Sequence, residues 1–238
     1  MASVEADRLT RLHARRIAGL DRLIVRRVQM VARGADIADI DRWWRREGGR
    51  KLVGLVAKGF AAAADISARH LVAHSAAEGA VLQVERPSQQ VERQATSLWV
   101  TGPVAFKTAV AAGAAPDVAL RSMRARLSGS ASRLVLAGDR ETFMGTFAVS
   151  DAMAGWRRVA RGDACAFCLM LVSRGAVYSK HSVEFQAHDH CRCGVEALYA
   201  REDDPPRVVE LREKWSASTA GVPVRDRLAA FRRAVDAA

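Results

Sequence analysis

The sequence predicts a mainly α-helical protein with a small α+β part towards its C-terminal end. Apolar residues recur every three or four positions over most of the chain, which is typical of helices with one buried face. Aromatic and β-branched residues become more frequent only after Gly175, and all four cysteines fall in one short segment. We therefore expect a helical N-terminal region over residues 1–113, followed by a compact domain over residues 114–238 that cysteine and histidine side chains hold together.

The composition indicates a globular protein with a strongly basic surface. Half of the 238 residues are hydrophobic, and the net charge is +11. Such an excess suits a polyanionic partner such as DNA, whereas the preference for arginine over lysine also fits a GC-rich genome. No apolar run approaches the roughly 18 residues that a membrane helix needs, and the N-terminus lacks the apolar core of a signal peptide. We expect that the protein does not associate with a membrane. We also expect it to be assembled in the cytoplasm of a bacterial host.

The first 50 residues predict one long helix and one short helix. Leucine, isoleucine and valine recur at helical spacing from Glu5 to Arg33, and Gly34 stops the pattern. Asp36 is placed to cap the next, short helix. That helix carries Trp43 and Trp44, which are adjacent and so cannot share one helical stripe. We expect one of them to pack inward and the other to meet a neighbouring element or a partner.

A third helix is expected over residues 51–78. It carries His70 and His74, one turn apart, a spacing that suits a metal pair. We see no acidic or thiol ligand near them and expect an ordinary helix surface. Residues 79–92 read as a loop, because glycine and proline interrupt the pattern.

The remainder predicts helices, then short strands, then helices again. Residues 97–113 and 115–162 read as mainly helical, and Pro116 is placed to open a helix. Within them we expect breaks at Gly102-Pro103, Gly113, Ser128-Gly129 and Gly138. Short strands are expected over 176–179 and 190–198. A turn over 202–206 precedes two final helices, near 207–217 and 224–236.

The most informative segment reads DACAFCLMLVSRGAVYSKHSVEFQAHDHCRCGVEAL, residues 163–198. It holds every cysteine and three of the six histidines. The Cys-x-x-Cys spacing lets two thiolates bind one metal from a tight turn. The candidate ligands are Cys165, Cys168, His188, His190, Cys191 and Cys193.

Spacing alone leaves the ligand set open. In an extended chain, side chains alternate between faces, so His188 and His190 would face one way and Cys191 and Cys193 the other. The CxxC pair would then combine with either pair, and a turn at Asp189 would permit a mixed set such as Cys165, Cys168, His190 and Cys193. We favour the four cysteines, because thiolates bind zinc tightly.

Three interpretations of the cluster compete. Structural zinc fits a reducing cytosol, where clustered cysteines are more often ligands or reactive groups than disulfides. Buried reduced thiols, or disulfides formed after release, are the second interpretation, and a catalytic thiol or zinc is the third. The zinc deaminase pattern needs H-x-E before the CxxC, and no H-x-E occurs in this sequence. A serine nucleophile elbow, a P-loop and a glycine-rich nucleotide motif are also absent, so we expect no enzyme, with a metal-dependent hydrolase as the alternative.

The segment GWRRVARGDACAFCLMLVSRGAVYSKHSVEFQAHDHCRCGVEALY, residues 155–199, resembles the cysteine-histidine core of the minor head proteins of tailed bacteriophages. These are the Mu F-like proteins, in the form common among phages of actinobacteria. The flanks SGSASRLVLAGDRETF and KWSASTAGVPVRDRLAAFRRAVDAA resemble the helices of that family. The likeness is close from about residue 114 to the end, whereas the N-terminal helices match in layout and charge.

The resemblance implies a structural role in the phage head, in the procapsid or virion. Its expected partners are the portal protein, the major capsid protein and phage DNA, bound without sequence preference, and its expected work is head assembly and the packaging or passage of DNA. A zinc-containing nucleic-acid-binding regulator is the alternative from another class, but we find no helix-turn-helix pattern to support it. The candidate phosphate-binding residues are Arg15, Arg16, Arg26, Arg27, Arg45, Arg46, Arg157, Arg158 and Arg161.

Overall fold

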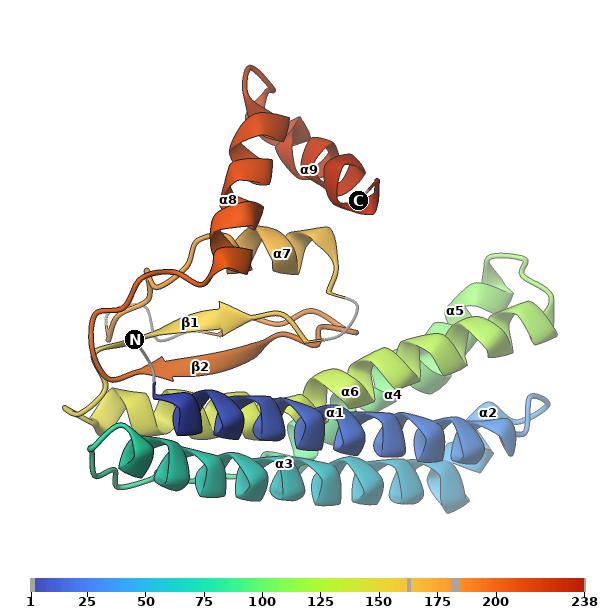
Figure 1. Cartoon of the computed structure of the whole chain (residues 1–238). Helices are drawn as coiled ribbons and strands as arrows, with labels where there is room; N and C mark the ends of the chain where they lie inside the picture. The colour runs from blue at the N-terminus through green and yellow to red at the C-terminus, as the bar shows by residue number, and fades with distance from the viewer. Residues whose placement is uncertain (1–2, 162–163, 181–184, 238) are drawn as a thin grey trace.

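Three long helices lie side by side along the whole molecule (Figure 1). The computed structural model describes residues 3–161, 164–180 and 185–237. The second and third of these helices run antiparallel to the first. They are α1 (Val4–Arg33), α3 (Gly49–Ala77) and α6 (Pro116–Val149). The mainly α class is thereby confirmed, and no helix in the described ranges is long and apolar enough to cross a membrane.

The first helix begins and ends close to its expected limits. The Ser3 side chain accepts a hydrogen bond from the Ala6 N–H, and Gly34 follows the last turn. The short helix α2 (Ile40–Trp43) is capped by Asp39, whose carboxylate accepts from the Arg42 N–H. Asp36, which we expected to be the cap, instead accepts from the Ala38 N–H in the preceding turn.

No turn separates α2 from α3. The π-helical segment η1 (Trp44–Gly48) joins them, so the chain stays helical through both glycines that follow the tryptophans. Trp43 is buried, while the Trp44 ring lies 5.5 Å from the Trp99 ring at the end of α4 (Val91–Trp99). The expectation for the two tryptophans is confirmed.

After the loop over residues 78–90, a short bent helical arm leads to α6. It consists of α4 (Val91–Trp99), η2 (Val100–Val104) and α5 (Ala105–Ala111). The expected break at Gly102-Pro103 is a kink inside η2, and the expected break at Gly113 is a left-handed turn with φ +89°. At the far end of that turn, Pro116 opens α6 as expected.

The helix α6 runs unbroken through Gly129 and Gly138, so the breaks expected there are wrong. These glycines serve packing between elements. A Cβ atom at Gly138 would collide with the Phe60 carbonyl oxygen of α3, and one at Gly129 with the His190 ring. Among the described elements, α3 and α6 make the most extensive contact. The two helices approach each other closely because Gly138 has no side chain between them.

A C-terminal unit lies against one end of the three-helix layer (Figure 1). It contains a two-stranded antiparallel sheet, in which Gly155 pairs with Leu198 and Val159 with Gly194. Its elements are β1 (Gly155–Val159), α7 (Ala166–Val172), β2 (Gly194–Leu198), α8 (Pro206–Thr219), η3 (Val224–Asp226) and α9 (Arg227–Asp236). The two final helices are confirmed, whereas we expected β1 to be helical. The strand expected over 176–179 is a single bridge between Tyr178 and Trp156.

Separate apolar clusters stabilise these parts. The largest fills the space between α1, α3 and α6, and therefore includes residues from both sides of position 113. A second cluster joins Phe143 and Phe147 of α6 to Trp156 and Val195 of the sheet, and a third lies among α7, α8 and α9. The domain boundary that we placed at residue 113 stays a prediction.

Candidate metal centre

The CxxC pair lies at the start of α7. Cys165 immediately precedes the helix and Cys168 lies in its first turn. Residues three positions apart share one face at a helix start, so both sulfur atoms point towards the same side. Cys168 is buried and Cys165 is exposed, which places the pair at the edge of the interior.

A tight turn carries the other candidate ligands towards this pair. The Cys191 N–H donates to the His188 carbonyl oxygen at 3.0 Å, and His190 adopts the left-handed conformation with φ +64°. The turn interrupts the alternation expected of an extended chain, so His188 and His190 do not point the same way. A turn near Asp189 is the condition under which we expected a mixed ligand set, but the histidine that it brings to the CxxC thiols is His188 and not His190.

Five side chains converge as a result. His188 Nε2 lies 3.3 Å from Cys165 Sγ and 3.5 Å from Cys168 Sγ. Cys168 Sγ lies 3.6 Å from Cys191 Sγ, and Cys193 completes a second group of three with these two thiols. Two triads thus share Cys168.

These spacings fit tetrahedral zinc. With Zn–S bonds of about 2.3 Å and Zn–N bonds of about 2.0 Å, ligand atoms lie roughly 3.5–3.8 Å apart. The three distances of 3.3, 3.5 and 3.6 Å agree with this within a few tenths of an ångström. Cys165, Cys168 and His188 form one group, and Cys168, Cys191 and Cys193 form the other. A four-ligand set such as Cys165, Cys168, His188 and Cys191 therefore needs the two triads to move closer together around Cys168.

The His188 ring is oriented for ligation. Its Nδ1 lies 2.6 Å from the Asp189 carbonyl oxygen and donates its hydrogen there. The other ring nitrogen, Nε2, is then left with a lone pair directed at the two thiols of α7. A ligating histidine usually has this arrangement, because the second hydrogen bond fixes the tautomer.

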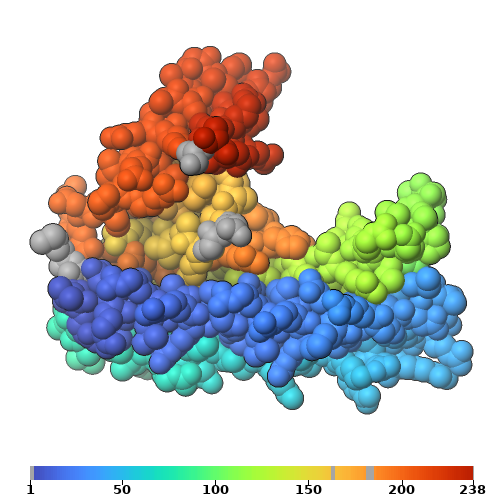
Figure 2. All heavy atoms as spheres, turned by 45° about the vertical axis from the view of Figure 1, so that its right-hand side comes forward, coloured from blue at the N-terminus to red at the C-terminus, as the bar shows by residue number. Residues whose placement is uncertain are grey.

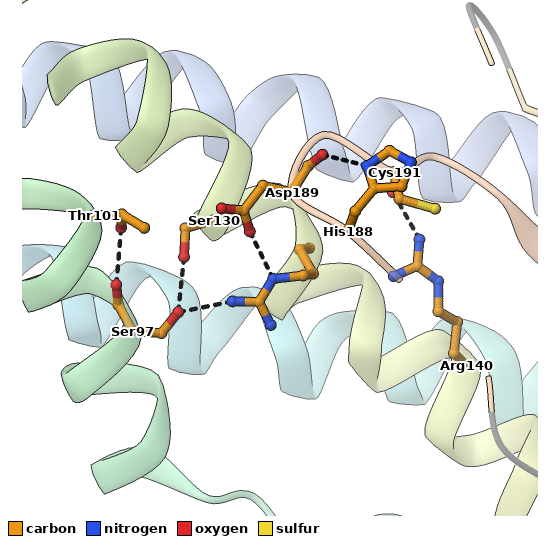
Figure 3. Close-up of polar contacts among 8 residues, drawn as sticks. Ser97, Thr101, Ser130, Arg140, His188, Asp189 and Cys191 are labelled. Carbon is orange, nitrogen blue, oxygen red and sulfur yellow. Dashed lines mark hydrogen bonds and ion pairs between the residues drawn. The ribbon is translucent and has the colours of Figure 1, made fainter. Parts of the chain in front are cut away.

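Arg140 of α6 forms hydrogen bonds with the backbone of the segment that carries Cys191 and Cys193. Its Nη2 donates to the Cys191 carbonyl oxygen at 2.7 Å (Figure 3). Its Nε donates to the Cys193 carbonyl oxygen at 3.0 Å. The side chain is 3 % exposed. A buried guanidinium bound to both carbonyls fixes the backbone of both thiols relative to α6.

Arg133, two turns earlier on α6, holds the turn itself. Its Nε donates to Asp189 at 2.7 Å and its Nη2 donates to the Ser97 hydroxyl at 2.7 Å. The Ser97 hydroxyl lies 2.9 Å from the Ser130 hydroxyl, and the Ser97 carbonyl oxygen accepts a hydrogen bond from the Thr101 hydroxyl (Figure 3). Polar contacts therefore run from the kinked arm through α6 to the residue beside His188.

The thiols influence one another electrostatically. A hydrogen bond from Cys168, together with the Arg140 charge, lowers the pKa of the Cys191 thiol. The same bond raises the pKa of Cys168. For His188, burial acts against the charged form, but hydrogen bonds to the Asp189 carbonyl and Cys165 raise its pKa overall. The shared hydrogen bond and the Arg140 charge thus lower the pKa of Cys191 relative to that of Cys168.

His190 points away from the cluster. Its N–H donates to the Gly129 carbonyl oxygen at 3.3 Å, and its ring occupies the space above that glycine. It therefore docks the turn on α6 and does not join either triad. His181, the third histidine of the segment, lies outside the described residues.

The candidate phosphate-binding arginines separate into two groups. Arg157, Arg158 and Arg161 are 5–8 % exposed. The guanidinium group of each interacts with another residue inside the fold. Arg157 pairs with Glu196 at 2.5 Å, Arg158 donates to the Gln186 carbonyl oxygen, and Arg161 pairs with Asp139 at 2.6 Å. Guanidinium groups that are buried and engaged inside the fold are not available to phosphates, so the phosphate contact expected of these three residues is not supported. The six on the first helices are exposed, namely Arg15, Arg16, Arg26, Arg27, Arg45 and Arg46.

A second buried polar cluster joins the helices to the sheet. Asp139 of α6 is fully buried and contacts Arg161, Ser67 and His13. Nε2 of His13 lies 2.9 Å from the carboxylate, too poorly aligned for a regular hydrogen bond. The His13 ring stacks on His70 at 4.3 Å.

The histidines of this cluster are neutral in the fold. Burial lowers the pKa of His13 and His74, and it lowers that of His70 to about 2. The ordinary helix surface expected for His70 and His74 is wrong. His74 is buried and contacts Tyr199, and His70 is partly covered by the His13 ring of α1 and by Phe143 of α6. The signal in the sequence for this buried cluster is the pair of adjacent charged residues Asp139 and Arg140, which follows the apolar stretch 134–137 of α6.

Comparisons with known proteins place the chain in a family. The family model described as VG15 protein matches residues 3–218, which is most of the sequence. The chain belongs to the VG15 protein family. This is a phage-associated family of viral gene products, so the chain is a phage-related protein. No match was found among curated proteins or among solved structures.

Proposed function

We propose that this VG15 protein is a minor head (minor capsid) protein of a tailed phage. It acts near the portal in head assembly and in the packaging or passage of DNA, as a structural component and not as an enzyme. The observation that carries the proposal is the match to a phage-associated family over residues 3–218. The Mu F-like character of the cysteine-histidine segment supports the finer assignment to the head.

The centre at α7 would hold one structural zinc ion. Cys165, Cys168, His188 and Cys191 are the ligands that we propose, because the three closest contacts among them, two at His188 and one between Cys168 and Cys191, have the spacing of a tetrahedral site. Four protein ligands leave no position for a reacting water, which supports a structural role. The ion would connect α7 to the turn at Asp189, and Arg140 and Arg133 connect that turn to α6.

The test of the head assignment is particle composition. Procapsids and heads would be purified by density gradient from cells infected with a phage that encodes this chain, then analysed by quantitative mass spectrometry. The proposal predicts the protein in both particles at a fixed ratio to the portal protein, with an abundant host cytosolic protein as the control for carry-over. Recovery of the protein only in the unassembled fraction would contradict it.

A further inference from the structure

The outer face of α1 carries a straight row of arginines. Arg11, Arg15, Arg22, Arg26 and Arg33 follow one another at intervals of four and seven residues. At 3.6 residues per turn these intervals confine the five side chains to an arc of about 60°. The row, which we call the arginine row, is about 33 Å long at 1.5 Å per residue.

The fold directs this row outward. The apolar face of α1, which includes Ile17, Ile24 and Val28, lies on the opposite side of the helix and is buried against α3 and α6. All five arginines of the row are exposed. Figure 2 shows α1, in dark blue, along the near face of the molecule, where the C-terminal unit does not cover it.

The charge of the row is not compensated within the fold. Among the described residues, Arg8 is the single arginine of α1 that pairs with a carboxylate, that of Glu5. From Arg8 to Arg33 the helix has eight arginines and one acidic residue, Asp21. Asp21 is buried and is engaged by Ser132 and Arg192. By contrast, many arginines elsewhere have partners inside the fold, as Arg140 and Arg161 have.

We propose that the arginine row binds the phosphate backbone of double-stranded DNA. Guanidinium groups match phosphate oxygens in pairs, and a straight row of them suits a stiff, regular polyanion better than an irregular acidic protein surface. Contacts from guanidinium groups to phosphates fix position on the duplex but carry no sequence information. The contact is therefore independent of sequence. The occurrence of this contact in the phage rests on the proposed function, because a protein of the phage head would lie close to packaged DNA.

The test compares two triple variants of equal charge. The variant of the row is Arg15→Gln, Arg22→Gln and Arg26→Gln. The matched control replaces three exposed arginines of the C-terminal unit that have no carboxylate partner among the described residues, by Arg201→Gln, Arg232→Gln and Arg233→Gln. Circular dichroism would first verify that both variants fold.

Binding would be measured by fluorescence anisotropy with a labelled random-sequence duplex of about 30 base pairs, between 50 and 200 mM salt. Each lost phosphate contact reduces the slope of log affinity against log salt by about 0.9. We expect the row variant to lose roughly two to three units of slope and to bind at least about tenfold more weakly, with the control within about twofold of wild type.

Three results would overturn the inference: no binding of the duplex by wild type at 50 mM salt, equal weakening in both variants, or strong preference for one duplex sequence. The composition of phage particles separates this outcome from the head assignment. A row variant that loses DNA binding but still enters heads supports both. Absence of the wild-type protein from heads, with DNA binding intact, would overturn the head assignment alone.

Discussion

Replacing Asp139 by asparagine should destabilise the protein strongly. The carboxylate is fully buried and lies 2.6 Å from Arg161, whose side chain is itself buried. Asparagine keeps the shape and can still accept a hydrogen bond from Ser67, so the main change is loss of the charge that compensates the guanidinium. Removing one partner of a buried ion pair costs about 3–5 kcal/mol.

That cost converts into a measurable thermal shift. For a chain of this size, each kcal/mol lowers the melting temperature by about 2–4 °C, so we expect a decrease of roughly 6–20 °C. Circular dichroism during heating and urea unfolding at pH 7 would both measure it. Asp151→Asn is the control, because Asp151 pairs with Lys180 but is itself fully exposed, so its replacement should produce no detectable shift.

A double-mutant cycle identifies the cause. If the unpaired guanidinium is responsible, Arg161→Met should cost much less in the Asp139→Asn background than in wild type. A loss below about 1 kcal/mol for Asp139→Asn, or additive losses in the cycle, would refute the argument that the ion pair stabilises the junction between α6 and the sheet.

Three further outcomes follow from the packing and the histidines. Gly138→Ala should cost at least about 1–3 kcal/mol in urea unfolding, because its methyl group collides with the Phe60 carbonyl, and an unchanged midpoint would contradict the close helix contact. Burial lowers the pKa of His70 to about 2 in the folded protein. Below about pH 6.5 the His70 side chain therefore binds a proton in the unfolded chain but not in the folded protein. Stability should therefore fall with decreasing pH, and His70→Gln should reduce that slope by up to about 1.4 kcal/mol per pH unit in urea titrations from pH 8 to 4; an unchanged slope would contradict its burial as a neutral ring. In metal analysis, His188→Ala should lose zinc while His190→Ala retains it, and the reverse would reassign the fourth ligand.

The sequence predicted local features of the fold well. The long first helix, the kink at Gly102, the left-handed turn at Gly113 and the final helices all depend on periodicity or on glycine and proline conformation. The cysteine-histidine cluster was also predictable, because ligand spacing survives in the sequence. Its members do converge, with the exception of His190.

The errors arise where tertiary contacts decide. A glycine inside a helix pattern can indicate a break or a close approach, and only the position of Phe60 shows that Gly138 serves the second purpose. The strand β1 carries two arginines that suggest a solvated helix face, yet Arg157 and Arg158 are buried beside partners that are distant in sequence. Likewise, the ligand set depends on the left-handed turn at His190, which β-strand alternation could not reveal.

The metal content of Cys168→Ser, set beside that of wild type, tests the proposed centre most directly, since this thiol belongs to both triads. Protein purified without chelator would be analysed by inductively coupled plasma mass spectrometry, together with its melting temperature before and after chelation. We predict about one zinc per chain in wild type, a lower melting temperature on chelation, and loss of the zinc in Cys168→Ser but not in Cys193→Ser. A metal-free wild-type protein that melts at the same temperature with and without chelator would contradict the structural zinc centre.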